Sequence, residues 1–387
     1  MSINECALSL ADPVSLKGLC RLRGEVFACG ADMKNRFSYF KDGEIYFSAD
    51  FGDLSRVENF SAYLEAVREM REHLAISPDV VAYDPHPYYF SSKAIGLFEG
   101  AKRLEVQHHQ AHIASVLAQS EARVDIIGVS FDGTGFGSDG NLWGGEFFTV
   151  SAHEYKRSGH LQYMKMPGAE KAVKQPWRMA FGLLYGSLGN KLFDKKLGLL
   201  KLRTKDEYYS LFRALENNFN FPLTSSCGRL FDAVSSLLGI THEVSFEAEA
   251  AVNLEKKAAL VEDDAFYTFD ITREKGVYIV GYRHFIEALL AEAAGGVAVE
   301  RLARRFHNSI AVLIVEMCGR LRQESGIATV ALSGGVFQNK ILRSLTLRQL
   351  RDAGFRILED DTVPINDLGI CVGQTYAALR GAGAVKE

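Results

Sequence analysis

The chain has 387 residues, of which 47% are hydrophobic and 24% are charged, and its formal net charge is −4. This is the composition of a globular protein that is long enough for two lobes with separate cores. The slightly acidic balance gives no reason to expect nucleic acid as the main ligand. No apolar run reaches the roughly 18 residues of a membrane-spanning helix, so we expect no membrane partner.

The cysteines predict a protein that works in a reducing compartment. They are scattered along the chain and form no C-x-x-C pair, which argues against a zinc knuckle and against a disulfide framework. Reduced thiols are the default in the cytoplasm. The N-terminal residues MSINECALSLADP also lack the basic segment of a signal peptide, so the sequence predicts a cytoplasmic protein.

The first part of the chain predicts three strands and a helix, then a strand, a short helix, a strand and a second helix. The Asp42-Gly43 turn favours a tight hairpin between the second and third strands. Apolar residues recur at helical spacing from Val57 to Leu74 and stop at Pro78. The predicted strands are 26–30, 36–40, 44–49, 79–83 and 103–106, and the later helices are 91–98 and 109–119.

The second half begins in the same way, with a strand at Val124–Phe131, a turn at Asp139-Gly140 and a return strand at Leu142–Val150. A strand that ends in small and acidic residues and leads into a hairpin therefore occurs twice, at Phe27–Asp32 and at Val129–Gly133. Duplicated lobes of this kind form the α/β, ribonuclease-H-like (actin-like ATPase) fold, whose ligand lies in the interlobe cleft. The alternative is an accidental likeness of two hairpins. The predicted lobes are residues 1–122 and 123–387, with helical insertions in the second lobe and a last helix that packs back toward the first.

The rest of the chain is predicted to be mainly helical up to Leu260 and to return to strands afterwards. A hairpin is expected at 266–280, a long helix at 299–325, a strand at 329–332, a helix that runs toward Gly354, and a strand at 355–358. Asp367 then lies at the N-terminal end of the last helix.

Residues that can bind a metal ion follow the fifth predicted strand. His108 and His112 are four residues apart, so on a helix they share one face. Two imidazoles in this arrangement can chelate a divalent metal, and Asp132 at a strand end offers a carboxylate as a third ligand. The alternative is a histidine pair whose hydrogen bonds are satisfied within the core or at the surface.

Two glycine-rich segments are candidates for contact with a nucleotide. Gly133-Thr134-Gly135-Phe136-Gly137 leaves backbone N–H groups free to converge on phosphate oxygens, although such a segment is also a common turn. Gly334-Gly335 lies between a predicted strand and a predicted helix, where a backbone can approach adenine or ribose closely.

Longer motifs stand out in chain order: CGADMKNRFSYF, DPHPYYFS, VQHHQAHIASV, VSFDGTGFGSDGNLWGGEF, PWRMA, CGRLFDAVSSLLGI, FHNSIA, LSGGVFQN and PINDLGICVGQ. Together they closely resemble the C-terminal transferase domain of the HypF family, the carbamoyltransferases of hydrogenase maturation. That domain is similar in turn to the antibiotic O-carbamoyltransferases and to the tRNA threonylcarbamoyl-adenosine transferase. The resemblance covers nearly the whole chain.

The resemblance implies a metal centre and a nucleotide site in the cleft. It implies that His108, His112, Asp132 and Asp367 hold an iron or zinc ion against the phosphate of a carbamoyl-adenylate derived from ATP. The catalytic residues implied are Lys34, His108, His112 and Asp132. The residues implied to bind the adenylate are Gly133, Thr134, Gly135, Arg229, Asp232, Gly334, Gly335 and Asn339.

The chemistry of a carbamoyl-adenylate fits these roles. It is a mixed anhydride and already activated, so a transferase mainly has to orient it and stabilise the charge that develops on the carbonyl and the leaving phosphate. A metal ion can do the latter as a Lewis acid. No nucleophilic side chain from this chain is then required.

The resemblance also implies partners. The acceptor would be the C-terminal cysteine thiol of a HypE-like protein in [NiFe]-hydrogenase maturation. Complete members of the family begin with an acylphosphatase domain, zinc-finger repeats and a YrdC-like domain, which do not fit before Val26. A separate YrdC-like protein is therefore expected to supply the adenylate. The alternatives are a small-molecule O-carbamoyltransferase and a noncatalytic nucleotide-binding scaffold subunit.

Four departures from the family pattern are visible. HHQAH has Gln110 where a third histidine is usual, GAEKA replaces a GGDKA-like turn, FEAEAA replaces a YEGQAA-like segment, and NDLG replaces NDGG. Side chains at Ala248 and Leu368, where glycine is usual, are expected to narrow or alter the pocket. The implied metal ligands are intact.

Overall fold

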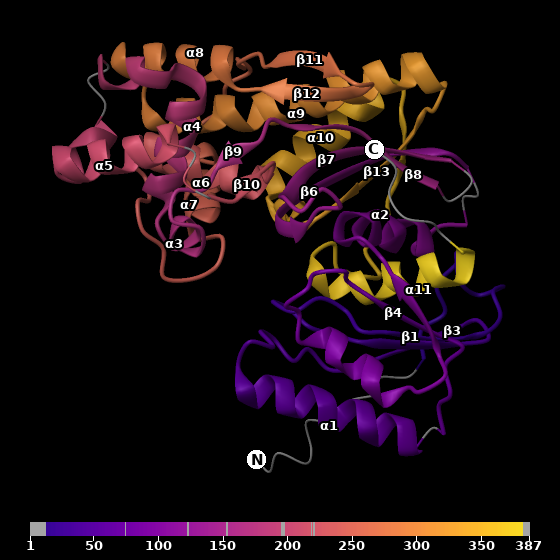
Figure 1. Cartoon of the computed structure of the whole chain (residues 1–387). Coiled ribbons are helices and arrows are strands. Elements are labelled where there is room, and N and C mark those ends of the chain that lie inside the picture. The colour runs from indigo at the N-terminus through magenta and orange to yellow at the C-terminus, as the bar shows by residue number, and fades with distance from the viewer. Residues whose placement is uncertain are drawn as a thin grey trace.

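The computed structural model describes residues 13–73, 75–121, 124–151, 154–194, 198–217, 219 and 221–381. Figure 1 shows two lobes in which layers alternate. From the bottom of the picture to the top, a helix, a sheet, a pair of helices, a second sheet and another helical layer follow one another. Further helices lie to one side of the second sheet.

The first sheet has the order β3-β2-β1-β4-β5. Its strands are β1 (Glu25–Ala28), β2 (Ser38–Lys41), β3 (Glu44–Phe47), β4 (Val80–Tyr83) and β5 (Lys102–Glu105). Strands β1, β2 and β3 are antiparallel neighbours, whereas β1, β4 and β5 run parallel. Helix α1 (Val57–His73) buries Tyr63, Val67 and Met70 in the core cluster that also contains Phe27 of the sheet.

The second sheet repeats this topology. Strands β6 (Ile126–Phe136), β7 (Leu142–Ser151), β8 (Glu154–Leu161), β13 (Thr329–Ser333) and β14 (Arg356–Leu358) have the order β8-β7-β6-β13-β14. The antiparallel and parallel pairings match those of the first sheet strand for strand. The predicted duplicated ribonuclease-H-like fold is therefore confirmed. The hairpin of β11 (Asp270–Glu274) and β12 (Val277–Gly281) extends this sheet beside β8.

Strand β8 was not predicted from the sequence, in which a helical region was expected from Ser158 onward. Lys156 and Arg157 interrupt the apolar pattern that marks a buried strand. Arg157 is nevertheless buried, with only 4% of its surface exposed. Its charge is neutralised there by an ion pair with Glu146 of β7. A local apolar pattern cannot reveal a strand that is stabilised in this way.

Two helices fill the layer between the sheets. Helix α2 (His108–Gln119) contacts β6 and β13 of the second sheet, and α11 (Ile370–Arg380) contacts β1, β2 and β4 of the first sheet. Each helix follows the fifth strand of its own half, so the halves exchange their last helices (Figure 1). A Cβ on Gly373 of α11 would lie 1.8 Å from the Ala111 carbonyl oxygen of α2, so the helices touch backbone to backbone.

The remaining helices lie on and beside the second sheet. Above it in Figure 1 are α9 (Val299–Ser325), whose bounds are those predicted, and α10 (Lys340–Asp352). The others are α3 (Glu170–Lys174), α4 (Pro176–Leu188), α5 (Lys205–Glu216), α6 (Cys227–Leu237), α7 (Glu249–Ala258) and α8 (Arg283–Ala294). Among the described residues, no helix combines the length and apolar character needed to cross a membrane. The predicted lobe boundary at 122/123 falls outside the described residues.

Two of the departures from the family pattern carry backbone strain. Ala169 before α3 has φ +51°, and Ala248 before α7 has φ +61°. Glycine adopts positive φ without cost, whereas a Cβ in this region costs about 1–2 kcal/mol. Leu368, in the short 3₁₀ turn η6 (Asp367–Gly369), does not have a positive φ. The backbone therefore favours glycine at position 248 but not at position 368, and the expected narrowing of the pocket stays a prediction.

We expect Ala169→Gly and Ala248→Gly each to raise the free energy of unfolding, by up to about 1 kcal/mol, because relief of strain exceeds the entropy cost of glycine. Urea denaturation followed by circular dichroism measures this change. The matched control is Ala291→Gly at an exposed position inside α8, which should lower the free energy of unfolding by about 1 kcal/mol. Destabilisation by both substitutions at the positive-φ sites would contradict this account of the strain.

Candidate active site

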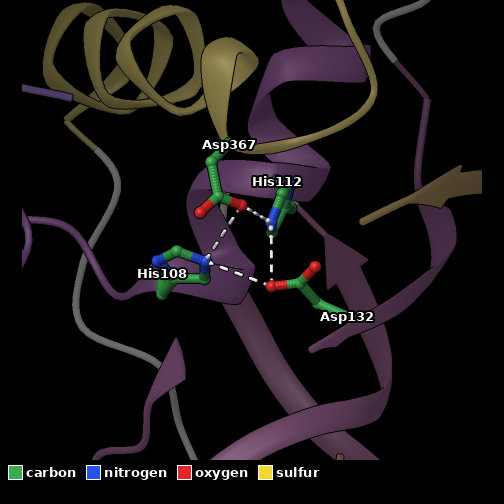
Figure 2. A group of neighbouring side chains, drawn as sticks. All are labelled: His108, His112, Asp132 and Asp367. Carbon is green, nitrogen blue, oxygen red and sulfur yellow. Dashed lines mark ion pairs between the residues drawn. The ribbon is translucent and has the colours of Figure 1, made fainter. Parts of the chain in front are cut away.

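Four side chains meet between the lobes (Figure 2). His108 and His112 point from one face of α2 toward Asp132 on β6 and toward Asp367, which begins η6 just before α11. The two imidazoles and Asp132 are buried, and one ligand atom from each of the four residues lies within 4.8 Å of the others. The structure therefore brings together the four residues that the sequence predicted as metal ligands.

The geometry fits a divalent metal. His108 Nε2 lies 3.5 Å from Asp132 Oδ2 and 3.9 Å from Asp367 Oδ1. His112 Nε2 lies 3.7 and 3.6 Å from the same two oxygens. A tetrahedral ion with ligand bonds of about 2.1 Å needs ligand atoms about 3.4 Å apart. Small movements of the four side chains would bring their ligand atoms to that separation. Both Nε2 atoms are buried without a hydrogen-bond partner among the described residues, which is costly unless a ligand takes their lone pairs.

The charges of the cluster compensate one another. Burial opposes a proton on either imidazole, but the neighbouring carboxylates raise the pKa of both histidines. Asp132 and Asp84 act on His108, and Asp132 and Asp367 act on His112. Burial would raise the pKa of Asp132, but the two histidines hold it well below its ordinary value. A metal must displace the protons on the imidazoles, so its binding should strengthen as the pH rises.

Three further contacts orient the ligands. Asp84 Oδ2 lies 2.9 Å from His108 Nδ1, and Ser333 Oγ lies 3.5 Å from His112 Nδ1. The Gly335 N–H donates to Asp132 Oδ1 at 2.9 Å. Contacts of this kind fix which nitrogen of a metal-binding histidine faces the ion. Asp84 and Ser333 were not predicted from the sequence, although both follow or end a predicted strand, as Asp132 does.

The remaining histidine of the HHQAH motif, His109, does not join the cluster. His109 is buried, and burial, followed by the charge of His108, lowers its pKa to about 3, so it is neutral. Its Nδ1 lies 3.2 Å from the Gln107 amide, and its ring lies 6.2 Å from that of Trp143. His109 therefore packs against the strands behind the metal ligands.

The first glycine-rich segment is a continuation of β6 and not the turn that the sequence suggested. Its register against β7 shifts between Phe131 and Gly135, and the chain turns later, around Asp139-Gly140. A Cβ on Gly135 would lie 2.5 Å from His109 Cε1 and 2.6 Å from His108 Cδ2. Gly135 is thus needed to make room for the imidazoles. Thr134 is exposed at the irregularity and Gly133 is half-buried there.

The other predicted nucleotide residues surround this irregularity. Gly334 has φ +104°, and a Cβ there would lie 2.2 Å from the Phe131 carbonyl oxygen. Arg229 and Asp232 of α6 are buried and pair at 3.0 Å, and a Cβ placed on Gly133 would lie 3.9 Å from an Arg229 guanidinium nitrogen. These residues are therefore positioned beside Asp132, on the second-lobe side of the metal ligands.

Asn339 is engaged with the protein itself. Its Oδ1 accepts the Leu342 N–H at the start of α10, and its Nδ2 lies 2.9 Å from His307 Nε2. His307 in turn contacts the Ala303 carbonyl through Nδ1, and burial lowers its pKa to about 4, so it is a neutral acceptor for the amide. Asn339 holds the segment after Gly334-Gly335 in place. His307 was not among the predicted residues.

Lys34 links the two lobes. Its Nζ pairs with Glu247 Oε1 at 3.0 Å, between the first lobe and the segment before α7. Burial would lower the pKa of Lys34, but Glu247, followed by Asp367 and Asp132, raises it, so the ammonium is charged and near the metal ligands. Glu247 was not predicted from the sequence either.

A second buried charge network supports the strands behind the site. Glu146 accepts hydrogen bonds from Arg157 Nε at 2.7 Å, from Ser225 Oγ at 2.5 Å and from the backbone at Gly144 and Gly145. The Arg157 guanidinium lies 3.8 Å from the centre of the Trp143 ring. Burial would raise the pKa of Glu146, but Arg157 and other neighbours lower it to about 2.

Comparison with protein families matches nearly the whole chain. Residues 21–119 match the model described as the HypF Kae1-like domain. Residues 128–374 match the model described as carbamoyltransferase, Kae1-like domain, second subdomain. The first match ends at the last residue of α2, and the second begins near the start of β6.

Individual relatives agree with these models. The chain is 33% identical to the carbamoyltransferase HypF of Synechocystis sp. over 92% of its own length and 47% of the relative. It is also 33% identical to a carbamoyltransferase HypF homolog of Cupriavidus necator over 92% of its length and 91% of the relative. The chain therefore spans about half the length of the first relative and most of the second.

Solved structures give the same result. A full-length HypF in a phosphate- and nucleotide-bound form superimposes with a TM-score of 0.88 at 31% identity, over 97% of this chain and 58% of that one. The T. kodakarensis HypF superimposes with a TM-score of 0.84 at 28% identity, over 96% and 49% of the two chains.

We expect Gly135→Ala to weaken zinc binding by about tenfold or more, because the methyl group would displace His108. Competition with a chromophoric chelator measures the affinity. Gly186→Ala in α4, where a Cβ meets nothing within 4 Å, is the matched control and should bind zinc like the unmodified protein. Equal affinities in all three proteins would contradict the steric role of Gly135.

We expect Glu146→Gln to lower the free energy of unfolding by about 3 kcal/mol at neutral pH, because Arg157 would lose its buried partner. The folded-state pKa of Glu146 is depressed from 4.5 to about 2, so its stabilisation is present above pH 4.5 and is lost as the pH falls toward 2. The difference between the two proteins in urea denaturation should shrink over that interval. Glu170→Gln, which breaks an exposed pair with Lys174, is the control and should leave the unfolding free energy unchanged. A difference that is constant with pH would contradict the assignment.

Proposed function

The chain belongs to the HypF carbamoyltransferase family, and on that premise we propose that it transfers a carbamoyl group from carbamoyl-adenylate to an acceptor thiol. The observation that carries the proposal is the cluster of His108, His112, Asp132 and Asp367, whose ligand atoms lie within 4.8 Å of one another in the cleft. Both imidazole Nε2 atoms face the two carboxylates and have no hydrogen-bond partner among the described residues, which suits them to bind a metal. Iron and zinc both accept this set of nitrogen and oxygen ligands.

The residues around the cluster suit an anionic, activated substrate. The backbone at half-buried Gly133 and exposed Thr134 can approach a phosphate, and Lys34 is a cation on the opposite lobe. Arg229 and Asp232 lie on the second-lobe side, where they can contact a nucleotide. A divalent metal, when bound, supplies Lewis-acid stabilisation of negative charge.

In the proposed reaction, the acceptor sulfur forms a bond to the carbamoyl carbon, and the bond from that carbon to the phosphate oxygen breaks. AMP leaves with the electron pair of the broken bond, and the thiol proton is released to water. The chain contributes by orienting the two reactants and by excluding bulk water from the buried cluster. Its own cysteines are not needed, and Cys29, Cys227, Cys318 and Cys371 are all buried.

Lys34 has to change its partner for this role. In the structure its ammonium is neutralised by Glu247. A phosphate that enters the cleft offers two or more oxygens in place of one carboxylate and can compete for the same ammonium. We expect Lys34 to leave Glu247 when the adenylate binds.

The acceptor in this proposal is the C-terminal cysteine of a HypE-like protein during [NiFe]-hydrogenase maturation, in the cytoplasm. A YrdC-like protein supplies the carbamoyl-adenylate in trans. The support for these partners is membership of the HypF family.

We expect the zinc- or iron-loaded protein, given synthetic carbamoyl-adenylate and a HypE-like protein, to add one carbamoyl group to the terminal thiol. Intact-mass spectrometry detects the mass increase, and peptide mapping locates it. His108→Ala and Asp367→Ala should lose both the metal and the transfer, because each removes a ligand. Glu170→Gln, which lies in the exposed pair with Lys174, should retain both.

Three other outcomes would contradict this proposal in different ways. Carbamoylation of a small-molecule hydroxyl but not of the thiol would assign an O-carbamoyltransferase. Binding of the adenylate without transfer would assign a nucleotide-binding scaffold. Unchanged metal content in His108→Ala and Asp367→Ala would show that the metal site is wrong.

A further inference from the structure

Two buried carboxylates hold the loop that follows β4, residues 84–91, at its two ends. At the first end, Asp84 Oδ1 accepts the backbone N–H of His86 at 2.9 Å. At the second end, Asp32 accepts the N–H groups of Phe90 at 2.6 Å and of Ser91 at 2.9 Å. Asp84 is 1% exposed and Asp32 is 7% exposed, so neither carboxylate can exchange these bonds for water.

The two carboxylates differ in one respect. Asp84 uses its second oxygen for His108 Nδ1, at 2.9 Å, on the side of the ring opposite the Nε2 that faces the other metal ligands. Asp32 uses both oxygens for the loop. One carboxylate therefore joins the loop of the first lobe to a metal-binding side chain of α2, and the other joins it only to the first lobe.

The loop also reaches the glycine-rich segment of the second lobe. The His86 ring stacks on Tyr89, with centroids 4.2 Å apart, and meets the edge of Phe136 at 5.3 Å. His86 Nδ1 accepts the Tyr88 N–H at 3.2 Å, and the Tyr88 side chain is 82% exposed. The loop thus spans from His108 to the glycine-rich segment of the second lobe, and it exposes Tyr88 to solvent.

We propose that Asp84 is a positioning residue that couples occupancy of the metal site to the order of the 84–91 loop. The inference rests on the metal centre proposed above. The Nδ1–H of His108 donates to Asp84, so Nε2 keeps its lone pair for the ion. The negative charge of Asp84 makes that nitrogen a stronger ligand. A bound metal fixes the His108 ring, the ring fixes the Asp84 carboxylate, and the carboxylate fixes the start of the loop.

The isosteric variants Asp84→Asn and Asp32→Asn separate this role from simple support of the loop. A carboxylate has two acceptor oxygens and a carboxamide has one, so each variant loses one of its two acceptors. In Asp32→Asn both contacts at stake belong to the loop, whereas Asp84→Asn has to choose between His86 and His108. The pair is therefore matched in burial, in charge removed and in acceptor oxygens lost, and differs in contact with His108.

The experiment measures zinc affinity by chelator competition, and it measures amide hydrogen exchange of residues 84–91 with and without zinc. We expect Asp84→Asn to bind zinc about 10- to 100-fold more weakly, and Asp32→Asn to keep an affinity of the same order as the unmodified protein. Zinc should slow exchange in the loop of the unmodified protein and of Asp32→Asn. It should have little effect on the loop of Asp84→Asn at zinc concentrations that saturate the site.

The outcomes distinguish this inference from the proposed function. Equal zinc affinities in Asp84→Asn and Asp32→Asn, or a loop whose exchange zinc does not alter in the unmodified protein, would overturn the coupling and leave the metal centre standing. Absence of zinc binding by the unmodified protein would overturn both. If Asp84→Asn fails to fold, the exchange measurement on the unmodified protein still decides whether the metal orders the loop.

Discussion

The close crossing of α2 and α11 is the constraint on which the site depends. Gly373 lets the two backbones touch at Ala111, where any side chain would collide with a carbonyl oxygen. Because the helices meet there, the face of α2 that carries His108 and His112 lies beside the turn that carries Asp367. Asp132 reaches the same point because β6 lies directly against α2. A cluster of candidate metal ligands drawn from distant parts of the chain is thus brought together by one contact between helices.

The sequence predicted the features that are local or that repeat a familiar pattern. The histidine pair, the strand ending at Asp132 and the helix at 299–325 each follow from spacing of apolar or polar residues. It did not predict β8, whose Arg157 is buried only because Glu146 arrives from another strand. Nor could it show that Gly135 makes room for His108 and His109, or that Asp84 reaches His108, since these contacts depend on how separate elements pack. Asp367 was grouped with the other three predicted ligands because a family resemblance supplied the long-range information, and the structure places the four side chains together.

The two buried charge clusters serve different ends. In the Glu146–Arg157 network every carboxylate oxygen has a donor, whereas Arg157 Nη2 is buried without a hydrogen-bond partner among the described residues. In the cluster around His108 the imidazole nitrogens that face the carboxylates have no hydrogen-bond partner among the described residues. A guanidinium nitrogen is only a donor and has no lone pair for a metal, whereas an imidazole nitrogen can offer one. The chemistry of the nitrogens without a partner, more than burial or charge, therefore distinguishes the two clusters.

The exchange of last helices between the two halves has a consequence for synthesis on the ribosome. The inner face of the first sheet, with Val26, Ala28 and Phe40, is covered in part by α11, which is translated more than three hundred residues later. Until α11 emerges, the part of this apolar face that α11 covers stays exposed, and the nascent first half cannot complete its core. The lobes should therefore not mature one after the other as independent folding units.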